Sequence, residues 1–189
     1  MPNVTLSVTG DTTAVTISDD FGNYALSSLP AGGNYTVTPT KSALVPGSAG
    51  INTVDVVAAQ RHFLQLGVLT GCRLTAADVN GDAGVNTVDL VAIQRFYLGM
   101  STGIANVGKY QFIPESRSYP GIVTSQTGQN YDTLVFGDVA GTFVHRFANP
   151  SQDAAINGSR FGEVPDVNMQ NPGFTVPDSV APRPSSRRR

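Results

Sequence analysis

One stretch of the chain occurs twice. Residues 48–64, SAGINTVDVVAAQRHFL, match residues 82–98, DAGVNTVDLVAIQRFYL, at eleven of seventeen positions with a constant offset of 34 residues. Similarity at a fixed spacing indicates an internal repeat. Two copies are too few for a helical-repeat solenoid, and each copy holds one helical pattern behind a loop rich in Gly and Asn. The duplication therefore predicts two equivalent loop–helix units in the centre of the chain.

Each copy ends in a short segment with helical periodicity. The predicted helices cover residues 56–64 and 90–98, with Gly67 and Gly99 as C-cap residues. Apolar residues recur at helical intervals, namely Val57 and Leu64 in the first copy and Leu90, Ile93 and Tyr97 in the second. Helices of about ten residues are marginal in isolation, so we expect the two to pack against each other through these apolar and aromatic side chains.

The loop of the second copy, DVNGDAGVNTVD at residues 78–89, carries oxygen-bearing residues at regular positions. Ca²⁺ takes about six to eight oxygen ligands, which a short loop supplies when alternate side chains turn inward. The candidate ligands are the side chains of Asp78, Asn80, Asp82, Asn86 and Asp89, at positions 1, 3, 5, 9 and 12, and the carbonyl of Gly84 at position 7. The loop therefore predicts a calcium site. The alternative is a polar turn with Asp89 as the helix N-cap.

Position 6 of this loop departs from the EF-hand pattern. EF-hand loops place Gly there for a sharp turn, whereas this loop has Ala83. A left-handed Ala costs on the order of 1 kcal/mol. The first copy has the same Ala–Gly pair, at Ala49 and Gly50, so we expect the two loops to share one turn geometry.

The loop of the first copy lacks the ligands at positions 1, 3 and 5. Leu44, Pro46 and Ser48 stand there, and only Gly50, Asn52 and Asp55 remain. This set favours a structural loop with Asp55 as a helix N-cap. The alternative is a weak calcium site that depends mainly on carbonyl oxygens.

The pattern D.N.D..[VI]N..D at residues 78–89, followed by a helix and duplicated in tandem, resembles the type I dockerin repeat over residues 42–99. The resemblance implies a calcium-folded module that binds cohesin domains on secreted proteins or the bacterial cell surface. It also assigns partner contacts to loop positions 10 and 11 and helix positions 17 and 18. These are Thr87, Val88, Gln94 and Arg95, mirrored by Thr53, Val54, Gln60 and Arg61. The alternative is that Thr and Val pack the loop while Gln and Arg form a solvated helix edge.

Residues 3–41 have the alternation and Gly-rich turns of an antiparallel β module. The expected strands are NVTLSVTG, AVTISDD, NYALSSL and NYTVTPTK. The spacing resembles the second half of carboxypeptidase regulatory-like and collagen-adhesin B-type modules, carried by Gly22, Tyr24, Leu29, Gly32, Gly33, Tyr35 and Val37. That resemblance implies a partial β-sandwich over residues 1–41.

The sequence as a whole predicts an α+β protein with four regions. Residues 1–41 form the β module, 42–103 the loop–helix pair, 104–148 a β segment beside that pair, and 149–189 loop and disordered tail. Gly137, Asp138 and Gly141 are interpreted as turn residues of the β segment. The order of these regions is similar to a recurring unit of large secreted or surface proteins of environmental bacteria.

Composition excludes several classes of function. A net charge of -2 and a pI near 5.5 argue against nucleic-acid binding. Cys72 stands alone, His62 and His145 lie far apart in sequence, and no apolar run has the ~18 residues that span a bilayer. The N-terminus lacks an export signal.

These observations predict a non-enzymatic, calcium-stabilised extracellular module that mediates protein association or spaces other domains. The alternative is an accessory fragment of a polysaccharide-degrading glycoside hydrolase. No pair of carboxylates has a recognisable acid/base setting, and direct glycan binding lacks support because the chain has no Trp.

Overall fold

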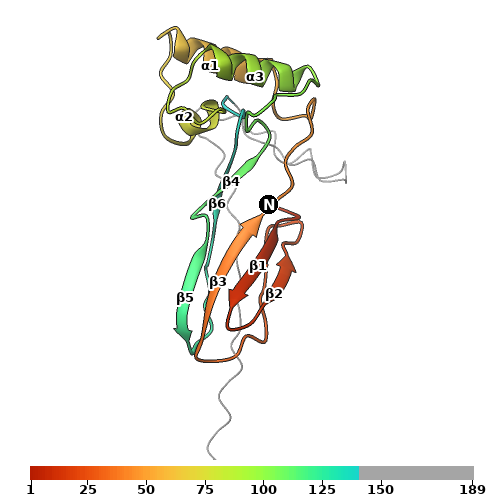
Figure 1. The fold of residues 1–189 in the computed structure, drawn as a ribbon, viewed down its shortest axis with the longest axis vertical. Coiled ribbons are helices and arrows are strands. Elements are labelled where there is room, and N and C mark those ends of the chain that lie inside the picture. The colour runs from red at the N-terminus through yellow and green to blue at the C-terminus, as the bar shows by residue number, and fades with distance from the viewer. Residues whose placement is uncertain (141–189) are drawn as a thin grey trace, which may run out of the picture.

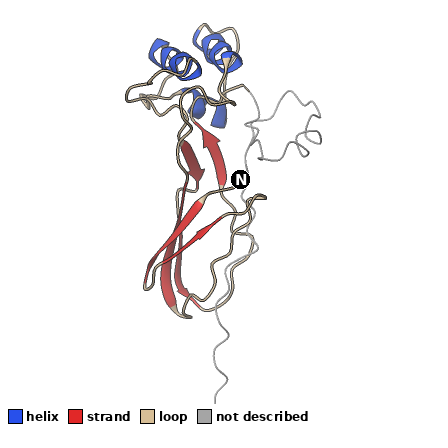
Figure 2. Cartoon of the chain, turned by 90° about the vertical axis from the view of Figure 1, so that its right-hand side faces the viewer, coloured by secondary structure: helices blue, strands red, loops and turns tan. Residues whose placement is uncertain are grey.

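The protein is described from a computed structural model, which covers residues 1–140 of the 189-residue chain. The predicted tail at 149–189, Gly141 and His145 lie outside the described residues. Within residues 1–140 the fold has two antiparallel sheets and three helices, so the α+β class is confirmed. The helices lie at one end of an elongated molecule and the strands extend to the other (Figures 1 and 2).

The larger sheet has four antiparallel strands in the order β2-β1-β3-β5. Its strands are β1 (Thr5–Gly10), β2 (Ala14–Ile17), β3 (Gly33–Thr40) and β5 (Arg117–Ile122). Alternation along β1 and β3 turns one face inward, and its buried side chains include Leu6, Val8, Tyr35 and Val37. The sequence alternation thus identified three of the four strands of this sheet.

The predicted strand at residues 23–29 is wrong. Tyr24, Leu26 and Leu29 are buried as the alternation requires, but the segment pairs with no strand. Ser28 has φ 64°, a left-handed conformation that interrupts an extended backbone. The edge of β3 is taken instead by β5, with Tyr35 opposite Tyr119 and Thr36 opposite Ser118.

The smaller sheet pairs β4 (Tyr110–Ile113) with β6 (Asp132–Val135) and runs between the two ends of the molecule (Figure 1). At the strand end, Phe112 and Tyr131 join the core of the larger sheet. The hydroxyl of the fully buried Tyr131 donates to the carbonyl of Val37 at 3.1 Å. At the helical end, Val135 and Val139 join the core of the helices. Residues 104–140 therefore contribute to the core of the helices and to the core of residues 1–41.

The helices are α1 (Thr53–Phe63), α2 (Gly71–Ala77) and α3 (Thr87–Tyr97). Helices α1 and α3 are the predicted pair and lie side by side (Figure 1). Each begins three residues before the predicted start, because Asn52 and Asn86 are the N-caps. Asp55, predicted as an N-cap, is the third helical residue of α1 and closes a capping box with Asn52. Helix α2 was not predicted from the sequence.

The helical core forms a second hydrophobic cluster, which extends from the loops to β6. Its buried members from the two long helices are Ala59, Ala92, Ile93 and Phe96. Val57, Leu64 and Tyr97, expected in the helix–helix contact, are 49%, 50% and 40% exposed. The predicted contact face is therefore wrong at these three positions.

The two long helices end alike. After α3, Gly99 has φ 75°, its N–H donates to the Phe96 carbonyl, and the Met100 N–H donates to the Arg95 carbonyl. After α1, Gln65 has φ 59°. Its N–H donates to the His62 carbonyl, and the Leu66 N–H donates to the Arg61 carbonyl. Both ends are Schellman motifs. Gly67 is therefore not the C-cap glycine of α1, because Gln65 takes the left-handed position.

Among the helices of residues 1–140, none is long and apolar enough to cross a lipid bilayer.

Candidate metal site and exposed helix face

Three carboxylates of the 78–89 loop lie close together. Oxygens of Asp78, Asp82 and Asp89 lie within 4.8 Å of one another. Ca²⁺ holds its ligand oxygens at about 2.3–2.6 Å, so two ligands of one ion stand at most about 5 Å apart. The spacing of these oxygens therefore allows them to hold one metal ion together. Asp89 is fully buried, Asp78 half-buried and Asp82 exposed.

Backbone amides shape the loop around these carboxylates. The Asp78 carboxylate accepts N–H groups from Gly81 at 2.8 Å, Asp82 at 3.2 Å and Ala83 at 2.9 Å. The buried Asp89 carboxylate accepts the Asn80 N–H at 3.1 Å and the Asn86 N–H at 2.9 Å. Because the amides at successive positions point to the same side, the carboxylates are drawn together at the centre of the loop.

Asn80 and Asn86 contact the third carboxylate. Their side-chain amides each donate to Asp82 Oδ2 at 2.8 Å, and the Gly84 N–H donates to Asp82 Oδ1 at 3.1 Å. The hydrogen bond from Asn80, with those from Asn86 and Gly84, lowers the pKa of Asp82 below its ordinary value against the opposing effect of desolvation. Asp82 is therefore ionised at neutral pH, which is the state that binds a cation.

The side-chain oxygens of the two asparagines have partners within the chain. Asn80 Oδ1 accepts the Asp82 N–H at 3.0 Å, and Asn86 Oδ1 caps α3 by accepting the Val88 N–H at 2.8 Å. Of the six predicted ligands, the structure thus brings the three carboxylates together. Asn80, Asn86 and Gly84 contact one of these carboxylates through N–H groups and not through the predicted ligand oxygens.

The turn residues of the two loops differ from expectation. Ala83 has φ 71°, so position 6 of the second loop is a left-handed Ala, a conformation that costs on the order of 1 kcal/mol. In the first loop Gly50 has φ 115°, whereas Ala49 is not left-handed. The Ala–Gly pair therefore does not give both loops one geometry. The shared left-handed residue stands at position 4, where Gly47 has φ 81° and Gly81 has φ 75°.

The eight predicted partner residues all lie on the surface: Thr53, Val54, Gln60, Arg61, Thr87, Val88, Gln94 and Arg95. Val54 is 60% exposed and Val88 is 58% exposed. Thr53, Val54, Thr87 and Val88 belong to the first turns of α1 and α3 and do not pack the loops.

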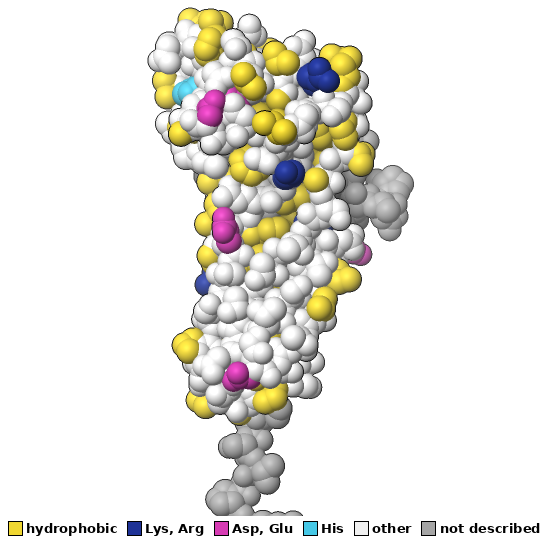
Figure 3. All heavy atoms as spheres, in the orientation of Figure 1, with side chains coloured by type: hydrophobic (Ala, Val, Ile, Leu, Met, Phe, Trp, Pro, Cys, Tyr) yellow, Lys and Arg dark blue, Asp and Glu magenta, His cyan; other side chains and the backbone are white. Residues whose placement is uncertain are grey.

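Further apolar residues on α1 and α3, and in the few residues after each helix, are exposed in matched pairs, each 34 residues apart. The pairs are Val57 and Val91, Phe63 and Tyr97, Leu64 and Leu98, and Leu66 and Met100. We call these eight residues, together with the eight partner residues, the exposed helix face. Hydrophobic side chains are visible over the helical end of the molecule (Figure 3). Sequence reasoning assigned Val57, Leu64 and Tyr97 to the core because helical periodicity does not say which apolar side faces inward.

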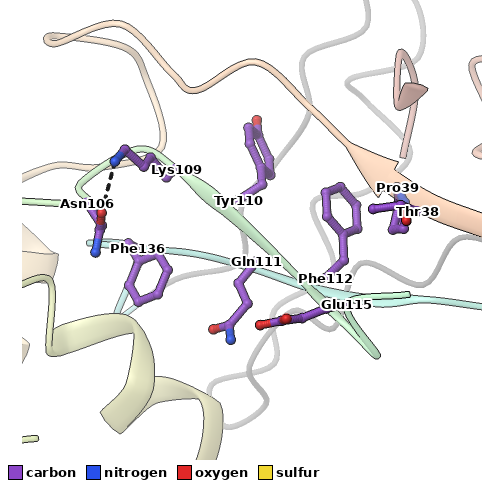
Figure 4. A pocket seen from close by; sticks show the side chains of 9 residues that line it. All are labelled: Thr38, Pro39, Asn106, Lys109, Tyr110, Gln111, Phe112, Glu115 and Phe136. Carbon is purple, nitrogen blue, oxygen red and sulfur yellow. Dashed lines mark hydrogen bonds between the residues drawn. The ribbon is translucent and has the colours of Figure 1, made fainter. Parts of the chain in front are cut away.

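An open groove lies beside β3 and β4 and contains none of the predicted site residues (Figure 4). Its volume is about 390 Å³, and its lining residues are Thr38, Pro39, Asn106, Lys109, Tyr110, Gln111, Phe112, Glu115 and Phe136. Lys109 Nζ donates to Asn106 Oδ1 at 3.0 Å, and burial raises the pKa of Tyr110 to about 12. The groove is lined by aromatic rings with one side chain of each charge.

No protein family model, curated protein or solved structure matches this chain.

Proposed function

We propose that the chain is a non-enzymatic, calcium-stabilised module that mediates protein–protein association, or spaces neighbouring domains, in a larger secreted or surface protein. The observation that carries the proposal is the exposed helix face, in which two copies of one loop–helix unit present the same apolar and polar residues to solvent. Matched apolar side chains left on a surface are typical of a docking site. The partner we propose is a cohesin-like domain with a complementary apolar surface.

The duplication has a consequence for binding. The N-terminal residues of α1 and α3 are the same Thr–Val–Asp triplet, and Gln–Arg recurs seven residues later in both helices. A partner that recognises one set therefore finds an equivalent set on the other helix. The helix pair thus offers two binding orientations, related by exchange of α1 and α3.

Calcium acts through the stability of the second unit. Three aspartates converge on one point, where a dication offsets their mutual repulsion. A cation that binds the folded loop and not the unfolded chain stabilises the fold by about 2.7 kcal/mol at a hundredfold excess over its dissociation constant. This supports an EF-hand-like role for the loop, in which the cation would bind just before α3, the helix that begins with Thr87 and Val88.

The calcium part is tested by thermal unfolding. We expect the melting temperature to rise with millimolar Ca²⁺ and to fall again with chelator, and Asp78→Ala or Asp89→Ala to remove most of that difference. The matched control is Asp132→Ala, an exposed aspartate on β6 outside the loop, which should leave the calcium response intact. A melting curve that does not respond to calcium in the unmodified chain would refute the calcium role.

The association part is tested by binding to a panel of immobilised cohesin domains in the presence of Ca²⁺. The double variant Val54→Ser, Val88→Ser should lose at least about tenfold in affinity, because it removes an apolar contact from both orientations. Val15→Ser is the matched control, since Val15 is 67% exposed on β2, away from the helices. Absence of binding to every cohesin in the panel would leave domain spacing as the function, and equal losses in both variants would exclude the exposed helix face.

A further inference from the structure

The aspartate at position 12 of the first loop is buried and fully engaged by backbone N–H groups. Asp55 is 1% exposed. Its Oδ2 accepts the Asn52 N–H at 2.8 Å, within the capping box of α1. Its Oδ1 accepts two N–H groups from a distant part of the chain, from Val139 at 2.8 Å and Ala140 at 2.9 Å. We call these two N–H groups the amide pair.

In the second loop, the equivalent oxygen, Asp89 Oδ1, has different hydrogen-bond partners. Asp89 Oδ1 accepts an N–H from inside its own loop, that of Asn80 at position 3, and the Asp89 carboxylate lies close to those of Asp78 and Asp82. The first loop has Pro46 at position 3, and proline has no N–H to donate. Its positions 1 and 5 hold Leu44 and Ser48. The first loop therefore lacks both the internal donor and the other two carboxylates.

A buried carboxylate oxygen without a donor or a cation is costly, because it loses its hydration without replacement. Two N–H groups that converge on one carboxylate oxygen form short, charge-assisted hydrogen bonds, which are stronger than those between neutral groups. The amide pair thus gives Asp55 the positive partial charges that its own loop does not supply.

The segment that carries the amide pair is held by backbone hydrogen bonds from Gly137 and Asp138. The Gly137 N–H donates to the Ala76 carbonyl at 2.7 Å, which ties the segment to α2, and the Asp138 N–H donates to the Val135 carbonyl at 3.1 Å. The Val139 side chain is 1% exposed in the helical core. The amide pair is therefore held against Asp55 by the hydrogen bond to α2 and by the helical core, to which Ile51 of the first loop also belongs.

We propose that the amide pair does for Asp55 in the first loop what a bound cation does for Asp89 in the second loop: it supplies positive charge to a buried carboxylate. The chain then binds one Ca²⁺ and not two. The start of α1 is linked to the segment after β6 by hydrogen bonds and needs no metal for this link. Where the calcium role proposed above holds, calcium stabilises the α3 half of the exposed helix face, while the α1 half is held at every calcium concentration. The amide pair itself does not depend on that role.

The test is hydrogen exchange of the Val139 and Ala140 amides in the full chain, followed by NMR with Ca²⁺ and with chelator. We expect both amides to be protected in both conditions. Asp55→Asn should accelerate their exchange at least about tenfold, since one oxygen must then serve donors that two oxygens served. Asp89→Asn is the matched control and should leave their protection unchanged.

Calcium titration of the same three proteins by calorimetry completes the test. We expect one Ca²⁺ per chain for the unmodified protein and for Asp55→Asn, and none for Asp89→Asn. Two Ca²⁺ per chain with one lost in Asp55→Asn would overturn the proposal, as would exchange of both amides at the rate of an unfolded peptide in chelator. If no Ca²⁺ binds, the calcium role fails. The exchange rates of Val139 and Ala140 in the unmodified chain then still show whether the amide pair is hydrogen-bonded, and this measurement does not require any variant to fold.

Discussion

The two loop–helix copies share most of their residues and both bury the aspartate at position 12, yet they satisfy that aspartate from different sources. Asp89 receives N–H groups only from its own loop and stands beside two other carboxylates. Asp55 receives one N–H from its own loop and two from residues more than 80 positions away. The difference follows from position 3, where Asn80 has a backbone N–H and Pro46 has none.

The two copies of the duplicated stretch thus have the same helix ends, whereas their loops differ. The capping boxes at Asn52 and Asn86 and the Schellman ends at Gln65 and Gly99 have the same hydrogen bonds. These bonds depend on residues within the copy. The environment of position 12 depends on residues outside the helix, and there the copies differ.

The largest expected effect is on the two buried aspartates. Asp55→Ala leaves three backbone N–H groups without an acceptor and Asp89→Ala leaves two, at about 1–3 kcal/mol for each buried donor. In chelator, we therefore expect Asp55→Ala to lower the free energy of unfolding by about 3–5 kcal/mol and Asp89→Ala by about 2–3 kcal/mol. Urea unfolding measures both. A larger loss for Asp89→Ala without calcium would mean that the amide pair contributes little.

The next effect concerns the segment that delivers the amide pair. Gly137 has φ 93°, and a Cβ at this residue would lie 2.7 Å from Val107 Cγ1. Gly137→Ala therefore adds a steric clash to backbone strain, and we expect a loss of about 2–3 kcal/mol with faster exchange at Val139 and Ala140. Gly128→Ala is the control, because Gly128 has φ 65° and open space for a Cβ, so only the strain of about 1 kcal/mol applies. Equal losses in the two variants would show that Gly137 is not confined by Val107.

The sequence predicted what each copy determines by itself. The α+β class and the two long helices follow from patterns within a few residues of one another. The three converging aspartates also follow from spacing, because positions 1, 5 and 12 of a tight loop turn toward one centre.

What the sequence did not predict depends on distant partners. The edge of β3 is filled by β5 from about 80 residues later, which no local alternation reveals, and the predicted strand at 23–29 fails at Ser28. Helix α2 is too short for a periodic signal, and its N-cap Thr70 makes no side-chain capping bond. The amide pair uses backbone N–H groups, which leave no trace in residue types, although Pro46 was a sign that the first loop lacked a donor.

A smaller effect is expected at the ends of the two long helices. Gly99 and Gln65 occupy the same left-handed position, at φ 75° and 59°. Gly99→Ala should cost about 1 kcal/mol, whereas Gln65→Gly should gain up to about 1 kcal/mol by relieving the strain of a side chain at positive φ. Thermal unfolding in chelator measures both. If Gln65→Gly destabilises the chain, contacts of the Gln65 side chain outweigh that strain, and the two helix ends are less alike than their hydrogen bonds indicate.

The smallest effect separates the two loops at position 6, where both have alanine. Ala83 is left-handed, so Ala83→Gly removes a strain on the order of 1 kcal/mol and loses part of it to the greater freedom of glycine in the unfolded chain. We expect a net gain of about 0.5 kcal/mol. Ala49 has no positive φ, so Ala49→Gly brings only the cost of that freedom, about 0.5–1 kcal/mol. The same substitution at equivalent positions should thus change stability in opposite directions, as measured by urea unfolding in chelator. A change of the same sign in both would mean that the two loops adopt one turn geometry in solution, as the shared Ala–Gly pair first indicated.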